Sequence, residues 1–129
     1  MTYVSRRIAV GILSLCISGI CAEAPQAQQN PFVGVWDAAY NPSGYPIRVE
    51  LIFQPNQTFS QLSQGSNFYY WMAGAYTVSA GRLVLMVKDW QPRTVQPVLQ
   101  EHHSFRFLSP DVLVLQTAGN APLTYRRRR

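Results

Sequence analysis

Short apolar segments, each ended by a cluster of turn-forming residues, are the feature that most limits how this chain can fold. From Phe32 onward, runs rich in Val, Ile, Tyr, Phe and Leu alternate at near-regular spacing with Pro, Gly, Asn and Ser. Such runs are typical of β-strands joined by turns. No convincing 3.6-residue repeat of an amphipathic helix extends over ten or more residues. The sequence therefore predicts an all-β fold.

The turn clusters divide the chain after residue 31 into about eight strands. Residues 47–53 alternate between apolar and polar side chains, except at Ile52, as expected of a strand with one buried face. Strands that follow one another in an up-and-down meander avoid unpaired edges by closing into a barrel. We therefore expect a single small antiparallel up-and-down barrel. The predicted strands are 32–40, 47–54, 59–64, 68–79, 82–90, 98–108, 112–117 and 123–126.

The longest run, residues 68–79, is rich in aromatic residues and contains a glycine. We expect Gly74 to mark a β-bulge or a bend. Strand alternation would leave Tyr69 and Trp71 exposed on the other face. The residues expected on the core face are Phe68, Tyr70, Met72, Tyr76 and Val78.

The first two dozen residues have the three parts of a secretory signal peptide. Residues 1–7 carry two arginines and no acid, residues 8–21 are apolar or small, and Ala22-Glu23-Ala24 fits the small-x-small cleavage pattern. The apolar run is short for a membrane span, although an uncleaved anchor or a buried helix is the alternative. The expected organisation is a signal peptide at 1–24, a disordered linker at 25–31 and a β-barrel domain at 32–129.

Export would make this a secreted or periplasmic protein. Both cysteines, Cys16 and Cys21, lie in the proposed signal, so the mature chain would have no disulfide and no thiolate metal site. Removing residues 1–24 takes away two of the eleven basic and one of the six acidic residues, and leaves a charge of +4. Four of the remaining basic residues form the run 126–129. This run could bind an anionic surface of the cell envelope, or it could be a solvated chain terminus. The nearly neutral body argues against a nucleic-acid groove.

The segment Gly34-Val35-Trp36 resembles the G-x-W opening of the lipocalin and fatty-acid-binding calycin group. In that group the glycine permits close packing, and the tryptophan closes one end of the barrel. An arginine near the final strand packs across this tryptophan, and Arg126 is expected in that role. Residues 74–85 are also similar to a hairpin of small bacterial lipocalin-like domains. The resemblance implies a lipocalin-like barrel, with Trp36 as a packing residue.

Residues suited to catalysis are few in the mature chain. The five acidic residues lie singly on different segments, and there is no cysteine and no G-x-S-x-G motif. Glu101-His102-His103 could bind zinc or move protons. Because neighbouring strand residues face opposite ways, His103 could act with Glu101 but not with His102, and a metal would need a further ligand such as Asp37 or Asp89. We predict no enzyme activity, no metal site and no cofactor.

Two functions fit these patterns. The first is binding of a small hydrophobic ligand inside the barrel, with Tyr70, Met72, Tyr76, Phe105 and Phe107 lining the interior and His103 as a polar anchor. The alternative is a protein-binding module of the cell envelope, an inhibitor or assembly factor, with Tyr69, Trp71 and Trp90 as exposed anchors. An open cavity would favour the first function, whereas Tyr69 and Trp71 exposed beside a solid core would favour the second. Neither function requires a membrane-spanning segment in the mature chain.

Overall fold

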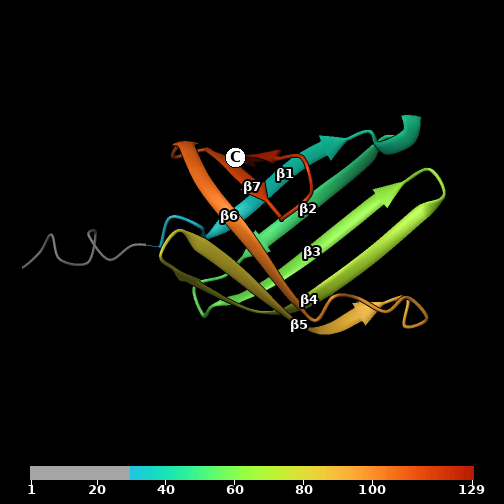
Figure 1. Cartoon of the computed structure of the whole chain (residues 1–129), viewed down its shortest axis with the longest axis horizontal. Helices are drawn as coiled ribbons and strands as arrows, with labels where there is room; N and C mark the ends of the chain where they lie inside the picture. Colours follow the sequence, from blue (N-terminus) through green and yellow to red (C-terminus); the bar gives the residue numbers. More distant parts are fainter. Residues whose placement is uncertain (1–29) are drawn as a thin grey trace, which may run out of the picture. The chain divides into compact units, whose positions relative to one another are not determined.

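Eight antiparallel strands close into one barrel in the computed structural model, which describes residues 30–129 (Figure 1). Each strand pairs with the next along the sequence, and the last strand pairs with the first. The predicted all-β, up-and-down barrel is therefore confirmed. The strands are β1 (Gly34–Tyr40), β2 (Ile47–Phe53), β3 (Thr58–Gly65), β4 (Phe68–Ser79), β5 (Arg82–Gln91), β6 (Gln100–Ser109), β7 (Val112–Gln116) and β8 (Leu123–Arg127).

The N-terminal predictions fall largely beyond this barrel. The proposed signal peptide, residues 1–24, and residues 25–29 of the proposed linker lie outside the described residues. Within residues 30–129, no helix has the length and apolar character needed to span a membrane. The helical element η2 (Pro42–Gly44) is a three-residue 3-10 turn between β1 and β2.

Turn chemistry fixes the β4–β5 hairpin. Ala80 and Gly81 have φ angles of 52° and 76°, the positive values that a two-residue turn between twisted strands requires. The pairing of β4 with β5 shifts between Ala73 and Gly74, because Lys88 is an extra residue between two paired positions of β5. A Cβ atom at Gly74 would lie only 1.9 Å from the backbone oxygen of Met86. The predicted bulge at Gly74 is thus confirmed, and the close approach of the two backbones explains the glycine.

Alternating side chains fill the barrel interior. Trp36, Leu51, Leu83, Leu85 and Leu113 have no exposed surface. Both Phe68 and Val78 were expected in this core, but each is more than 40% exposed, because they lie near the two ends of β4. Tyr69 is exposed, as predicted, whereas Trp71 is half-buried.

The barrel has two chemically different ends. Because neighbouring strands are antiparallel, the loops after β1, β3, β5 and β7 lie at one end, and those after β2, β4 and β6 lie at the other (Figure 1). The second end is filled by Phe32, whose ring packs edge-on against Phe53, Phe105 and Phe107 at centroid distances of 5.0–5.5 Å. Trp36 Nε1 donates a hydrogen bond to the Phe32 carbonyl oxygen at 2.8 Å. We call this the Trp36 end, and the opposite one the cavity end.

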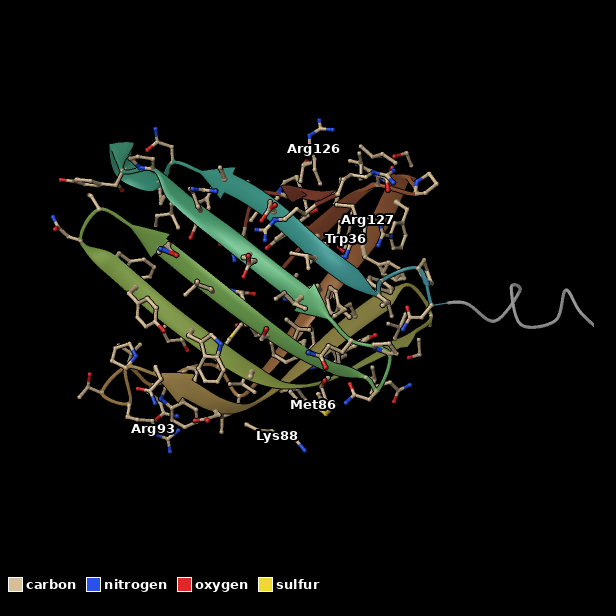
Figure 2. All side chains as sticks on the ribbon, turned by 180° about the vertical axis from the view of Figure 1, so that it is seen from behind. Trp36, Met86, Lys88, Arg93, Arg126 and Arg127 are labelled. Atoms are coloured by element: carbon tan, nitrogen blue, oxygen red, sulfur yellow. The ribbon has the colours of Figure 1, made fainter. Side chains whose placement is uncertain are left out.

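An arginine packs across Trp36, but it is Arg127 rather than the predicted Arg126. The guanidinium carbon of Arg127 lies 4.4 Å from the centre of the Trp36 ring. The register pairs Trp36 with Arg127 and Asp37 with Arg126, so the alternation of side chains turns Arg126 outward. Figure 2 shows Arg127 beside Trp36 and Arg126 pointing away from the barrel.

The rest of the arginine run is also part of the fold. Arg128 forms two hydrogen bonds with the Asp37 carboxylate at 2.6 and 2.8 Å and an ion pair with Glu50 at 2.6 Å. Arg129 is ion-paired with Asp111. These two side chains are exposed to solvent, as the solvated-terminus interpretation expects, but strands β1 and β2 and the β6–β7 turn also supply carboxylates for them.

Candidate functional site

A cavity of about 460 Å³ opens at the cavity end, next to the β7–β8 loop. Leu115 on β7 and Leu123 on β8 form a cross-strand pair on the interior face and supply part of its apolar wall. Tyr40, at the end of β1, lies on the same face as Trp36 and faces into the barrel. The complete lining is Tyr40, His103, Leu115, Thr117, Asn120, Ala121, Pro122, Leu123 and Tyr125.

A histidine and a carboxylate on β6 supply polar groups to this interior. His103 and Glu101 pair with Leu83 and Leu85, which are completely buried, so both point inward. His103 Nε2 lies 3.2 Å from Glu101 Oε1. The side chains are 14% and 27% exposed, which leaves them partly within reach of solvent. His102 points outward and contacts Gln100 at 3.3 Å, so the prediction that only Glu101 and His103 can act together is confirmed.

Two tyrosines lie within electrostatic range of Glu101. Burial, and to a smaller extent the Glu101 carboxylate and Tyr40, raise the pKa of Tyr125 above its ordinary value of 10.0. Burial and Glu101 also raise the pKa of Tyr70. Since both phenols keep their protons at neutral pH, they are available as hydrogen-bond donors. Four strands thus bring Tyr40, Tyr70, Glu101 and Tyr125 close together.

The six residues predicted to contact a ligand divide between the cavity and the core. His103 lines the cavity, and Tyr70 lies close enough to Glu101 to interact electrostatically. Met72 and Tyr76 are almost completely buried, and Tyr76 packs against Phe53 at 4.7 Å. Phe105 and Phe107 pack against Phe32 at the Trp36 end. Ligand contact by these six residues stays a prediction.

Several cavity residues escaped the sequence analysis. Leu115, Leu123 and Tyr125 lie on two short C-terminal strands, and Tyr40 is the last residue of its strand. The alternation within each strand identifies the shared face of Leu123 and Tyr125. It does not show which strands face one another across the barrel, since that depends on the long-range register.

Residues considered as additional metal ligands lie on the outer surface and have other partners. Asp37 is hydrogen-bonded to Arg128, and Asp89 forms an ion pair with Arg93 at 3.3 Å. Among the residues that the structure describes, no three potential metal ligands come together.

The three aromatic anchors of the alternative function do not share one surface. Tyr69 is 56% exposed, and Trp71 shares its outward-facing side of β4. Trp90 pairs with Met72 and faces inward instead. The Arg93 guanidinium lies 4.0 Å over its ring, and Trp90 Nε1 has no hydrogen-bond partner within the described part of the chain. Figure 2 shows Arg93 on the loop beyond β5.

A second hollow, of about 400 Å³, lies on the outer face of β1, β2 and β3. Asp37, Arg48, Glu50 and Arg128 lie along it. Arg128 is already bonded to the carboxylates of Asp37 and Glu50, so these three charges satisfy one another without a ligand. The interior cavity is therefore the stronger candidate site.

No protein-family model matches this chain, and no curated protein matches it significantly.

Proposed function

We propose that this protein is an exported, non-enzymatic binding protein, a lipocalin-like barrel that holds a small hydrophobic molecule. The observation that carries the proposal is the cavity of about 460 Å³ inside one end of the barrel. Small-molecule sites in proteins have volumes of roughly 300–1,000 Å³ and apolar walls with few polar groups. The G-x-W segment and the stacking of Arg127 on Trp36 support the lipocalin-like assignment.

The cavity lining indicates the chemistry of the ligand. Leu115, Pro122 and Leu123 offer apolar contacts to a hydrophobic body. His103, Tyr40 and Tyr125 offer hydrogen bonds to a polar group at one end. A small molecule with a hydrophobic body and one hydrogen-bonding group fits this lining best.

Native mass spectrometry of the protein purified from its own host tests the proposal directly. A small mass that accompanies the folded protein and is lost on denaturing extraction is the expected result. It would also identify the class of ligand. A protein with no bound mass would remove the main support for a carrier function and direct the search to protein partners.

A fluorescent apolar probe, N-phenyl-1-naphthylamine, tests whether the cavity is the binding site. Leu123→Trp fills the cavity and is expected to weaken probe binding at least about tenfold, because the larger ring occupies the apolar volume. Thr124→Trp is the matched control, since Thr124 is the next residue of β8 and points outward. Ala121→Trp also places a large ring at the cavity, but from the exposed β7–β8 loop, so that no strand residue is changed. If all three variants bind the probe as tightly as the wild type does, the binding site lies elsewhere.

The protein-binding alternative is favoured by one observation, the exposure of Tyr69 beside a core that is solid around Met72 and Tyr76. A pull-down from envelope extract with the wild type and Tyr69→Ser tests this function. A partner that binds the wild type and loses affinity for Tyr69→Ser would support it. Retention of the same partner by both would exclude Tyr69 as its anchor.

A further inference from the structure

Exposed apolar side chains gather at the cavity end of the barrel. Of the nine large hydrophobic residues that are exposed within residues 30–129, seven lie at this end, and their exposed fractions range from 42% to 69%. The other two, Val78 and Leu108, belong to the Trp36 end. We call the seven the apolar rim, and they are Tyr40, Tyr45, Phe68, Tyr69, Val95, Val98 and Leu99.

The rim comes from separate parts of the chain that the topology brings to one end. The β1–β2, β3–β4 and β5–β6 connections all project to the right in Figure 1. Tyr40 belongs both to the rim and to the cavity lining. The exposed apolar surface is therefore continuous with the mouth of the candidate binding site.

The loops at this end carry almost no charge. Residues 41–46, 66–67, 92–99 and 117–122 include one charged residue, Arg93, and no acid. The Trp36 end, in contrast, carries Asp111 and the run 127–129. Arg93 is ion-paired with Asp89 near the end of β5, so this pair is neutral. An end with apolar side chains and little net charge costs little to remove from water.

The chemistry of the rim fits the surface of a lipid bilayer. The four loops contain no acid, so they present no carboxylate that anionic headgroups would repel. Tyrosine suits the boundary between headgroups and hydrocarbon, since its ring is apolar and its hydroxyl is polar. Three of the seven rim residues are tyrosines.

We propose that the cavity end docks on the surface of a lipid bilayer through the apolar rim, with the cavity mouth facing the lipid. In this orientation, a hydrophobic molecule passes between bilayer and cavity without crossing open water. Docking goes beyond ligand binding, and the two can fail independently, because the rim and the inner cavity wall are altered by different substitutions.

Flotation with lipid vesicles tests the docking. The protein purified from its own host is mixed with vesicles of phosphatidylcholine and phosphatidylglycerol in equal amounts. We expect the wild type to float with the vesicles and the double variant Val98→Glu/Leu99→Glu to bind at least about tenfold more weakly, since two apolar contacts become charged. Leu108→Glu is the matched control, because Leu108 is 59% exposed at the opposite end, and its binding should equal that of the wild type.

Three results would overturn the proposal. The wild type could fail to float, or Leu108→Glu could lose as much binding as the double variant. A wild type that sediments as a dimer without lipid, and that Val98→Glu/Leu99→Glu converts to a monomer, would assign the rim to contact with a second copy. Circular dichroism of each variant confirms that the barrel is intact, and probe binding by the double variant shows whether the cavity still works when docking is lost.

Discussion

Arg127, on the last strand, contacts the start of the first strand through several groups of one side chain. Its guanidinium stacks on Trp36, and its Nη1 donates a hydrogen bond to the Val33 carbonyl oxygen at 2.6 Å. Its Nε donates a hydrogen bond to Asp111 at 3.2 Å. A planar group with five donors can stack and donate in several directions at once, which a lysine ammonium cannot do. Arg127 is therefore a structural residue of the Trp36 end.

Replacing this side chain should destabilise the barrel. We expect Arg127→Ala to lower the free energy of unfolding by about 2 kcal/mol, since it removes a cation–π contact and charged hydrogen bonds. Arg126→Ala should change the free energy by less than about 0.5 kcal/mol, because Arg126 is exposed. Urea denaturation measures both values. A similar loss in the two variants would show that Arg127 has no special role.

Tyr125 should make the fold sensitive to alkaline pH. Burial raises the pKa of its phenol above 10.0 in the folded state. Below pH 10 the phenol is protonated in both the folded and the unfolded state. Above pH 10 the unfolded chain loses the proton first, so the free energy of unfolding falls as the pH rises. The contribution is up to about 1.4 kcal/mol per pH unit. We expect Tyr125→Phe to reduce this slope in urea titrations above pH 10.

The control for this titration is Tyr45→Phe, since Tyr45 is the most exposed tyrosine of the described chain. Its slope should match that of the wild type. An unchanged slope in Tyr125→Phe would mean that other groups cause the alkaline loss.

At the scale of elements, the bulge between β4 and β5 combines a local sequence signal with a long-range contact. Gly74 is the one position of β4 where the backbone of β5 comes too close for a side chain. After the bulge, Trp90 occupies the inward position opposite Met72, and Asp89 turns outward. One extra residue in β5 thus decides which of these two side chains faces the interior.

A methyl group at Gly74 should therefore disrupt both strands. We expect Gly74→Ala to lower the free energy of unfolding by more than about 3 kcal/mol or to prevent folding, because its Cβ would overlap the Met86 backbone oxygen. Gly119→Ala is the control for backbone strain without a steric overlap, since Gly119 has a positive φ of 82° but open space around it, and it should cost only about 1 kcal/mol. Thermal unfolding followed by circular dichroism compares the two. A cost at Gly74 no larger than the cost at Gly119 would show that the close approach of the Met86 backbone does not require the glycine.

Strands and turns could be predicted from the sequence because they depend on neighbouring residues. Residues 68–79 were predicted as one strand, with Gly74 as an irregularity, and both predictions are confirmed. The arginine beside Trp36 was placed one residue too early, because a shift of one residue changes the face of a strand and only the β1–β8 register decides it. The cavity could not be predicted, since Tyr40, His103 and Tyr125 meet only through barrel closure.

For the whole molecule, the two ends of the barrel have opposite character. The Trp36 end combines aromatic packing with the ion pairs of Arg127, Arg128 and Arg129, and the cavity end combines an opening with exposed apolar side chains. Stability is therefore concentrated at the end away from the candidate site. Such a division lets the loops around a binding site vary while the closed end maintains the fold.

Shortening the chain should open the barrel between β1 and β8. A chain that ends at Arg126 lacks the Arg127 contacts and the hydrogen bond from the Arg128 backbone nitrogen to the Val35 oxygen at 2.7 Å. We expect fast hydrogen exchange in β1 and a loss of more than about 3 kcal/mol in the free energy of unfolding. A chain that ends at Arg128 loses only the exposed contact with Asp111 and should stay within about 0.5 kcal/mol of the full chain. Slow exchange of β1 in the shorter chain would contradict this role of residues 127 and 128.

The pairing of the first strand with the last also sets the order in which the protein can fold. β1 leaves the ribosome first, yet its second neighbour, β8, is synthesised last, so the ring cannot close on a growing chain. Until then, β1 keeps one unpaired edge and Trp36 lacks its arginine. This order of folding would suit the proposed export, since transport across a membrane as an extended polypeptide requires an incompletely folded chain.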